Sequence, residues 1–164
     1  MNIKEVLKKH EMWLNGEDGG EKAALHSANL RYADLRYADL RYADLRYADL
    51  RSANLRYANL HSADLRYADL RYADLRSADL RYADLSSADL FGEKINKIPL
   101  MIYNLKYDLL FTEKHIKIGC EVHKVEAWKE FNDKRILEMD GKSALLWWKE
   151  NKEFVMSCYK KHIG

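Results

Sequence analysis

Hydrophobic positions recur every five residues through the middle of the chain. From residue 21 to residue 90 the sequence divides into 14 consecutive five-residue units without an insertion, and seven of these units read RYADL. Every unit ends in Leu, and Ala stands two residues before each Leu. We predict that these leucines form a structural core ladder, which consists of Leu25, Leu30, Leu35, Leu40, Leu45, Leu50, Leu55, Leu60, Leu65, Leu70, Leu75, Leu80, Leu85 and Leu90.

A period of five residues fits neither an α-helix nor a flat strand. On a helix with 3.6 residues per turn, successive leucines would lie roughly 140° apart and would form no apolar stripe. The two faces of a strand alternate with period two. Within one unit, Ala and Leu alternate with polar residues, and two outward-facing residues then follow in succession. The pattern therefore predicts short extended segments separated by one corner per unit, in a coil whose stacked turns lie ~4.8 Å apart.

The tandem unit Ala-(Asp/Asn)-Leu-X-X resembles the repeat of the pentapeptide-repeat family. The resemblance covers 70 of 164 residues. It implies a mainly β chain that forms a right-handed quadrilateral β-helix, in which each coil consists of four of the five-residue units. The stretch HIKIGCEVHKVEAW, residues 115–128, resembles phage and bacterial members of the family whose role is unassigned. The near-identity of the units indicates either a recent duplication or an idealised, engineered array.

The array divides the chain into three predicted regions. Residues 1–20 form an N-terminal helical cap, residues 21–90 the β-helix, and residues 91–164 an α+β C-terminal capping or interaction region. Apolar residues with helical spacing predict a helix over residues 2–14, with Asn2 as N-cap and Glu5 completing a capping box. The cap is expected to cover the first coil, because the open end of a repeat array needs one.

The C-terminal region has no repeat and reads as a mixture of strands and helices. We predict strands over residues 102–105, 107–111 and 115–119, helical turns over 125–131 and 134–139, and a final helix over 143–162. Asn132 or Asp133 is the expected N-cap of the second helical turn. Trp128, Trp147 and Trp148 are candidates for an interface with a protein partner or a second copy, since aromatic residues are enriched in interface cores. Core packing is the alternative for these three residues.

The charge of the array argues against two kinds of nucleic-acid function. Residues 21–90 contain 11 basic and 11 acidic residues. Some members of the resembling family bind DNA gyrase by imitating duplex DNA, which requires a strongly negative surface, and a neutral array does not supply one. Nucleic-acid binding by Arg and Tyr is also disfavoured, because acidic neighbours cancel the positive potential. Ser also replaces Tyr at positions 52, 62 and 77, which we expect to break any continuous aromatic strip.

The sequence offers few residues for catalysis or cofactor binding. No glycine-rich phosphate loop, acid pair or complete nucleophilic triad stands out, so we predict that the chain is not an enzyme and has no cofactor. Cys120 with His123 and Cys158 with His162 have spacings that could ligate zinc. The alternative is a buried structural Cys with surface His residues. Two cysteines are too few for a secreted disulfide scaffold, so we expect a cytoplasmic protein, and no apolar run approaches the ~18 residues that would span a membrane.

These observations favour a non-enzymatic structural or protein-interaction scaffold. The alternative function is a topoisomerase-directed antagonist that imitates DNA, and a gyrase supercoiling assay would separate the two. A protein partner or a homodimer is expected, whereas a membrane or a nucleic acid is not.

The period predicts the outcome of a deletion. Removal of residues 41–60 takes out one coil and keeps the remaining units in register, so the shorter protein should still unfold cooperatively in a thermal melt. Loss of cooperative unfolding would contradict a coil of four units.

Overall fold

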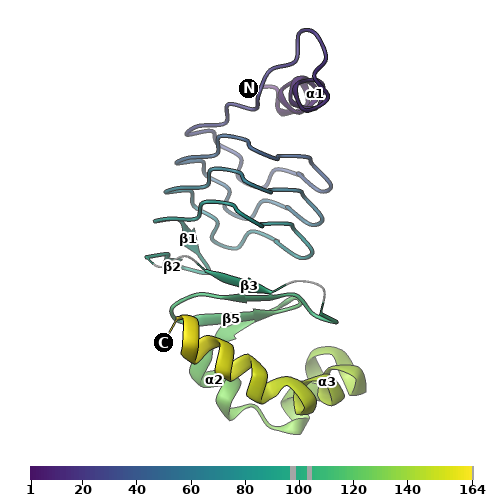
Figure 1. Cartoon of the computed structure of the whole chain (residues 1–164), viewed down its shortest axis with the longest axis vertical. Coiled ribbons are helices and arrows are strands. Elements are labelled where there is room, and N and C mark those ends of the chain that lie inside the picture. Colours follow the sequence, from purple (N-terminus) through teal and green to yellow (C-terminus); the bar gives the residue numbers. More distant parts are fainter. Residues whose placement is uncertain (97–98, 103–104, 164) are drawn as a thin grey trace. The chain divides into compact units, whose positions relative to one another are not determined.

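The computed structural model describes residues 1–96, 99–102 and 105–163, and the chain separates into two compact units, Met1–Ile98 and Pro99–Gly164. The first unit contains helix α1 (Ile3–Leu14), the repeat array, and the strands β1 (Asp89–Leu90) and β2 (Glu93–Lys94) (Figure 1). Among its described residues, the second unit contains four strands and two helices.

The array is a stack of coils, and each coil consists of four repeat units. Ten parallel bridges join positions that are four units apart in the sequence, from Ala24↔Asp44 to Asp69↔Asp89. The backbone N–H of Leu45 donates to the carbonyl of Asp64 at 2.8 Å, and the N–H of Asp64 donates to the carbonyl of Ala43 at 3.0 Å. The same exchange repeats along the array, and Figure 1 shows the resulting coils one above another. The architecture is therefore β-helix-like.

A sharp turn separates each bridging position from the next. In one example the N–H of Ala48 donates to the carbonyl of Leu45 at 3.1 Å, and the intervening Tyr47 has φ 58°. A positive φ at the third residue and a negative φ at the second define a type II turn. The third position repeats this left-handed conformation, with φ between 55° and 62°, at the 13 residues Ser27, Tyr32, Tyr37, Tyr42, Tyr47, Ser52, Tyr57, Ser62, Tyr67, Tyr72, Ser77, Tyr82 and Ser87.

The prediction of a mainly β chain is confirmed only as far as the array is β-helix-like. Because a turn occurs in every unit, each side of a coil keeps one bridging residue and the array up to Asp84 contains no continuous strand. The last coil ends where β1 pairs antiparallel with β2, with Leu90 opposite Glu93.

The interior of the array is filled by Leu and Ala. All 14 repeat leucines are at most 4% exposed, and Ala43, Ala48, Ala53 and Ala68 are fully buried. Ala33, Ala38, Ala73 and Ala83, which belong to the first and last coils, are half-buried. The leucines are therefore screened in every coil, whereas some alanines of the first and last coils are only partly covered; Ala23 and Ala88, which also lie in these end coils, are buried.

Helix α1 packs against the start of the first coil. His10 is fully buried, and its Nδ1 accepts a hydrogen bond from the N–H of Ala23 at 3.0 Å. Gly20 passes so close to the helix that an added Cβ would lie 2.4 Å from the backbone nitrogen of Trp13. Asn2 is the N-cap, but its side chain makes no capping hydrogen bond. The predicted capping box is therefore wrong, because Asn2 is exposed and contributes only its carbonyl, to Val6.

The second unit is a four-stranded antiparallel sheet with two helices. The sheet order follows the chain, β3 (Leu100–Ile102), β4 (Leu109–Phe111), β5 (His115–Ile118) and β6 (Glu121–Lys124). The predicted strand over 102–105 lies partly outside the described residues, and β6 had not been predicted. Helix α2 is Val125–Glu130, and α3 is Asp133–His162 with a break in helical geometry at Asp140 and Gly141.

One predicted feature of this unit is confirmed in detail. Asn132 is the N-cap of α3, and its side chain accepts a hydrogen bond from the N–H of Arg135 at 3.0 Å. Among the described residues, no helix is both long enough and apolar enough to cross a membrane.

The buried imidazole predicts an acid-sensitive cap. Burial lowers the pKa of His10, and the nearby charges of Lys22 and Arg41 act in the same direction, whereas Asp39 and a hydrogen bond to the Arg41 backbone oppose the shift. A protonated Nδ1 could no longer accept from Ala23. Stability should therefore be intact above the unfolded pKa of about 6.5 and should fall as the pH drops below it.

Thermal melts at pH 7 and pH 5 test this expectation. The unaltered protein should lose several degrees of melting temperature at pH 5, and a His10→Asn variant, which keeps an acceptor without a titrating ring, should lose less. Equal losses in the two proteins would contradict a role for His10.

Candidate interaction surface

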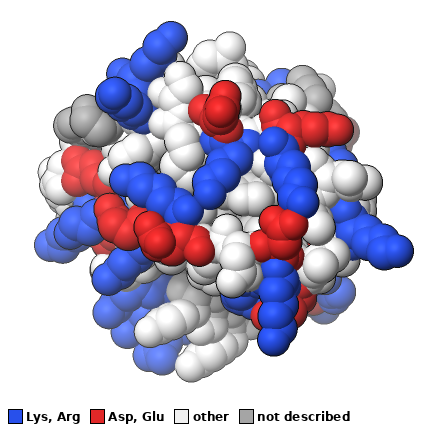
Figure 2. Space-filling view, turned by 90° about the horizontal axis from the view of Figure 1, so that it is seen from below, with Lys and Arg blue, Asp and Glu red and all other residues white. Residues whose placement is uncertain are grey.

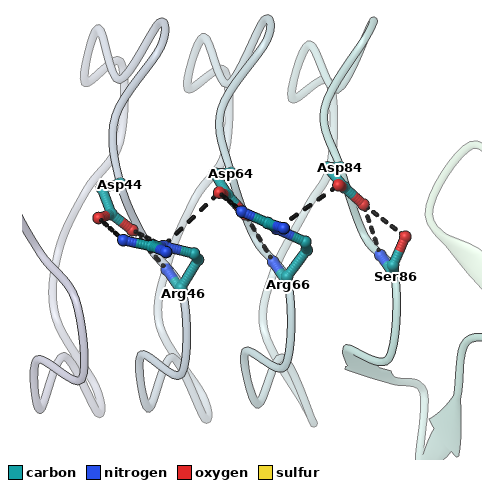
Figure 3. A network of polar contacts seen from close by, with 6 residues as sticks. All are labelled: Asp44, Arg46, Asp64, Arg66, Asp84 and Ser86. Carbon is teal, nitrogen blue, oxygen red and sulfur yellow. Dashed lines mark hydrogen bonds and ion pairs between the residues drawn. The ribbon is translucent and has the colours of Figure 1, made fainter.

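Asp and Arg side chains form ladders on the outside of the array. Arg46 binds Asp44 through two hydrogen bonds, Nε to Oδ1 at 2.8 Å and Nη2 to Oδ2 at 2.6 Å. Its Nε also lies 3.6 Å from Oδ2 of Asp64 in the next coil. Arg66 repeats both contacts with Asp64 and Asp84, and the ladder ends where Ser86 donates to Asp84 at 2.6 Å (Figure 3).

Each Asp also shapes the backbone. Oδ1 of Asp44 accepts from the N–H of Arg46 at 3.2 Å, and Oδ1 of Asn54 accepts in the same way from Arg56. Asp and Asn therefore serve the turn equally, and only Asp adds the ion pair. The hydrogen bond with the Arg46 guanidinium lowers the pKa of Asp44 to about 2, and Arg66 likewise lowers the pKa of Asp64.

The ladders neutralise the carboxylates of the array. Eight of its Asp residues form ion pairs with the Arg two positions later, as the structure describes them: Asp34, Asp39, Asp44, Asp49, Asp64, Asp69, Asp74 and Asp79. Figure 2, which views the molecule from below, likewise shows basic and acidic side chains intermixed on the visible face. Neither the surface with the ladders nor the face in Figure 2 presents the continuous negative charge of duplex DNA.

Where Asn replaces Asp, the following side chain takes another partner. Arg31 and Arg56 follow Asn29 and Asn54, and each guanidinium lies over the ring of the next tyrosine, at 5.4 and 5.5 Å. His61 follows Asn59 and makes ring contacts instead. The choice of Asp or Asn therefore decides whether the outer side chain is held in a ladder.

The tyrosines form columns at the corners of the coils. Tyr37 stacks on Tyr57 with ring centroids 5.0 Å apart, and Tyr47 stacks on Tyr67 at 4.8 Å. The two members of each pair belong to successive coils, so the coil spacing also sets the ring spacing. The eight tyrosines of the array are between 44% and 86% exposed, which gives the surface a set of aromatic rings at regularly repeated positions.

The expectation that Ser62 breaks the aromatic strip is wrong. The ring of His61 contacts Tyr42 at 6.3 Å and Tyr82 at 5.1 Å, and Tyr42 contacts Trp13 of α1 at 6.4 Å. Four rings therefore form one continuous row. The missed signal was that His precedes Ser62, where most units have Arg.

The three candidate interface tryptophans are buried in the second unit. Trp128, Trp147 and Trp148 are 2%, 8% and 5% exposed and pack in one cluster with Phe111, Ile116 and Val155. Trp128 also donates to the carbonyl of Ile116 at 2.8 Å. This position corresponds to the core-packing alternative, and the rings have little surface left for a partner.

These tryptophans also line a cavity of about 90 Å³, together with Tyr107, Ile118 and Asp140. Its volume is well below the roughly 300–1,000 Å³ that is typical of ligand pockets. The hydroxyl of Tyr107 donates to Asp140 at 2.6 Å, and burial together with this bond raises the pKa of Tyr107.

The zinc candidates do not form a recognisable site. His123 contacts Glu121 at 2.8 Å, while Cys120 is exposed and Cys158 is half-buried. Within the described part of the chain, no three His, Cys, Asp or Glu residues are grouped as a metal site requires.

The turn geometry, the ladder of bridges between successive coils and the outward columns define a β-helix-like repeat protein. The family model for pentapeptide repeats matches residues 21–56 and 58–92, in 8 copies. Residues 21–56 and 58–92 are therefore pentapeptide repeats. No curated protein matches it significantly.

Several solved structures of pentapeptide repeat proteins are similar to the chain. HetL from the cyanobacterium Nostoc sp. strain PCC 7120, a protein involved in heterocyst differentiation regulation, is 42% identical, with a TM-score of 0.44, over 46% of this chain and 35% of its own. A protein from the thylakoid lumen of Arabidopsis thaliana is 32% identical, with a TM-score of 0.39, over 44% of this chain and 53% of its own. The chain therefore spans about a third of the first of these proteins and about half of the second.

The two roles of Asp can be separated by mutation. In Asp64→Asn the amide should still accept from the N–H of Arg66, so only the exposed ion pairs are lost and the melting temperature should change little. Asp64→Ala also removes the acceptor, which should cost about 1 kcal/mol more. Thermal melts of the two variants measure the difference, and equal destabilisation would contradict the role of Oδ1 in the turn.

Proposed function

We propose that the chain is a non-enzymatic scaffold that binds a protein partner through the outer surface of its array. In this proposal the array is a right-handed, four-sided β-helix, as the family resemblance implies. The observation that carries the proposal is the set of eight exposed tyrosines, each held in one backbone conformation at a coil corner. Tyrosine is enriched in protein interfaces, and a ring that is already stacked on a neighbour, as in the pairs Tyr37–Tyr57 and Tyr47–Tyr67, loses less entropy on binding.

The charge of the surface supports a protein partner over other partners. The Asp residues are engaged by Arg, which leaves no excess of either sign to attract a polyanion or to imitate one. For this reason we do not propose gyrase antagonism. A scaffold of this kind also agrees with the general character of pentapeptide repeat proteins, which are structural or interaction proteins.

Replacing tyrosines by serine, column by column, tests the proposal. Serine is native at five equivalent turn positions, so the variants should keep the fold. The four double variants are Tyr47→Ser with Tyr67→Ser, Tyr37→Ser with Tyr57→Ser, Tyr42→Ser with Tyr82→Ser, and Tyr32→Ser with Tyr72→Ser. Each would be used, beside the unaltered protein, in quantitative affinity capture from the source cells.

A matched control lies in the other unit. Leu146 and Phe154 are exposed on α3, so Leu146→Ser with Phe154→Ser removes a comparable apolar area. We expect to find a protein that both the unaltered chain and this control capture. The captured amount of that protein should fall at least fivefold with one of the column variants. Capture that depends on α3 alone, or on no column, would contradict the proposal.

A further inference from the structure

Two tyrosines of the array differ from the other six. Among the described residues, every array tyrosine except Tyr32 and Tyr72 contacts another aromatic ring. Tyr32 and Tyr72 are 71% and 86% exposed. They belong to one corner column, with Ser52 in the coil between them, because the N–H of Tyr32 donates to Arg51 and that of Ser52 donates to Arg71.

A second column shows what such an arrangement can hold. Tyr42 and Tyr82 are also separated by a serine, Ser62, and the imidazole of His61 lies between the two rings. The planes of the rings are inclined by 80° and 72° to the imidazole. A planar ring is therefore accommodated between two tyrosines two coils apart, above a serine.

The first column lacks this ring because its corresponding side chain is held elsewhere. Arg51 precedes Ser52 as His61 precedes Ser62, but Arg51 forms an ion pair with Asp49 at 2.5 Å and lies 3.4 Å from Asp69. His61 follows Asn59 and has no such carboxylate two positions earlier. Tyr32 and Tyr72 should lie about 9.5 Å apart, twice the coil spacing, which leaves ~4.8 Å on each side of an inserted ring. This separation is within the range of favourable aromatic pairs.

We propose that Tyr32, Ser52 and Tyr72 form an aromatic slot that receives an aromatic side chain of a protein partner. The proposal rests on the interaction function proposed above and specifies the contact that the partner makes. A protein side chain is favoured over a nucleobase because a protein side chain occupies the equivalent place in the second column and because the array carries no net positive charge.

Arg31 adds a preference for an acidic residue beside the aromatic one. Its guanidinium lies 5.4 Å from the centre of the Tyr32 ring, and no described carboxylate is within ion-pair distance of it. Its own unit has Asn29 where most units have Asp. A carboxylate next to the inserted ring could therefore pair with Arg31.

The slot can be tested with a defined probe. We would titrate the full chain with the dipeptide Ac-Asp-Trp-NH2 and follow the ring resonances of assigned tyrosines by NMR, with Ac-Asp-Leu-NH2 as the non-aromatic control. The tryptophan peptide should shift the signals of Tyr32 and Tyr72 in a saturable manner, and the leucine peptide should not.

Three variants complete the experiment. Tyr72→Ser should weaken binding of the tryptophan peptide about tenfold, whereas Tyr57→Ser, in a column whose rings are already stacked, should not. Asp49→Asn with Arg51→His copies the second column and should block the slot with the protein's own imidazole. The amide spectrum of each variant establishes that it is folded.

Several results would overturn the slot. They are the absence of saturable shifts, equal binding to the Tyr72→Ser variant, undiminished binding to the Asp49→Asn, Arg51→His variant, or a response of the same tyrosines to oligothymidylate but not to the peptide. If only the slot is wrong, affinity capture should still find a partner that depends on another tyrosine column. If the scaffold function is wrong, no column variant should reduce the capture of any partner.

Discussion

The left-handed backbone at the residue before each Ala is the constraint on which the array depends. It makes the chain turn once in every repeat unit, and after four turns the backbone lies beside its own course in the preceding coil. Leu and Ala are thereby directed inward, and Tyr, Arg and Asp outward. The conformation is uncommon for residues other than Gly and is unfavourable at each site. It is repeated at 13 positions from Ser27 to Ser87, so the buried leucines and the inter-coil hydrogen bonds must offset its cost.

The same constraint explains the character of the outer surface. Because side chains of equivalent units recur at the coil spacing, an Arg can contact the Asp of its own unit and that of the next coil, and a tyrosine can stack on the tyrosine of the next coil. Substitutions within the repeat then act as local switches. Asn in place of Asp releases the following side chain, and Ser in place of Tyr opens a place between two rings. The variation among otherwise near-identical units therefore differentiates four corners that the repeat alone would make alike.

The sequence indicated the period, the inward leucines, the N-terminal helix and the Asn132 cap, because each depends on residues close together in the chain. The ring of His61 between Tyr42 and Tyr82 was not foreseen, since it depends on residues one coil away and on the absence of a carboxylate at position 59. The capping box failed because the spacing of Asn2 and Glu5 permits a hydrogen bond without requiring one. Exposure of the tryptophans could not be read from the sequence, because core and interface use the same residue type.

The register of four units per coil is the central claim, and a disulfide test addresses it most directly. In a chain with Cys120 and Cys158 replaced by Ser, Tyr47→Cys with Tyr67→Cys places two thiols one coil apart, at a spacing that a disulfide can bridge. Tyr47→Cys with Tyr57→Cys places them half a coil apart, on opposite corners. We predict that mild oxidation of the folded protein closes an intramolecular disulfide rapidly and completely in the first variant and not in the second. Equal closure in both variants, or faster closure of the pair half a coil apart, would contradict the coil described here.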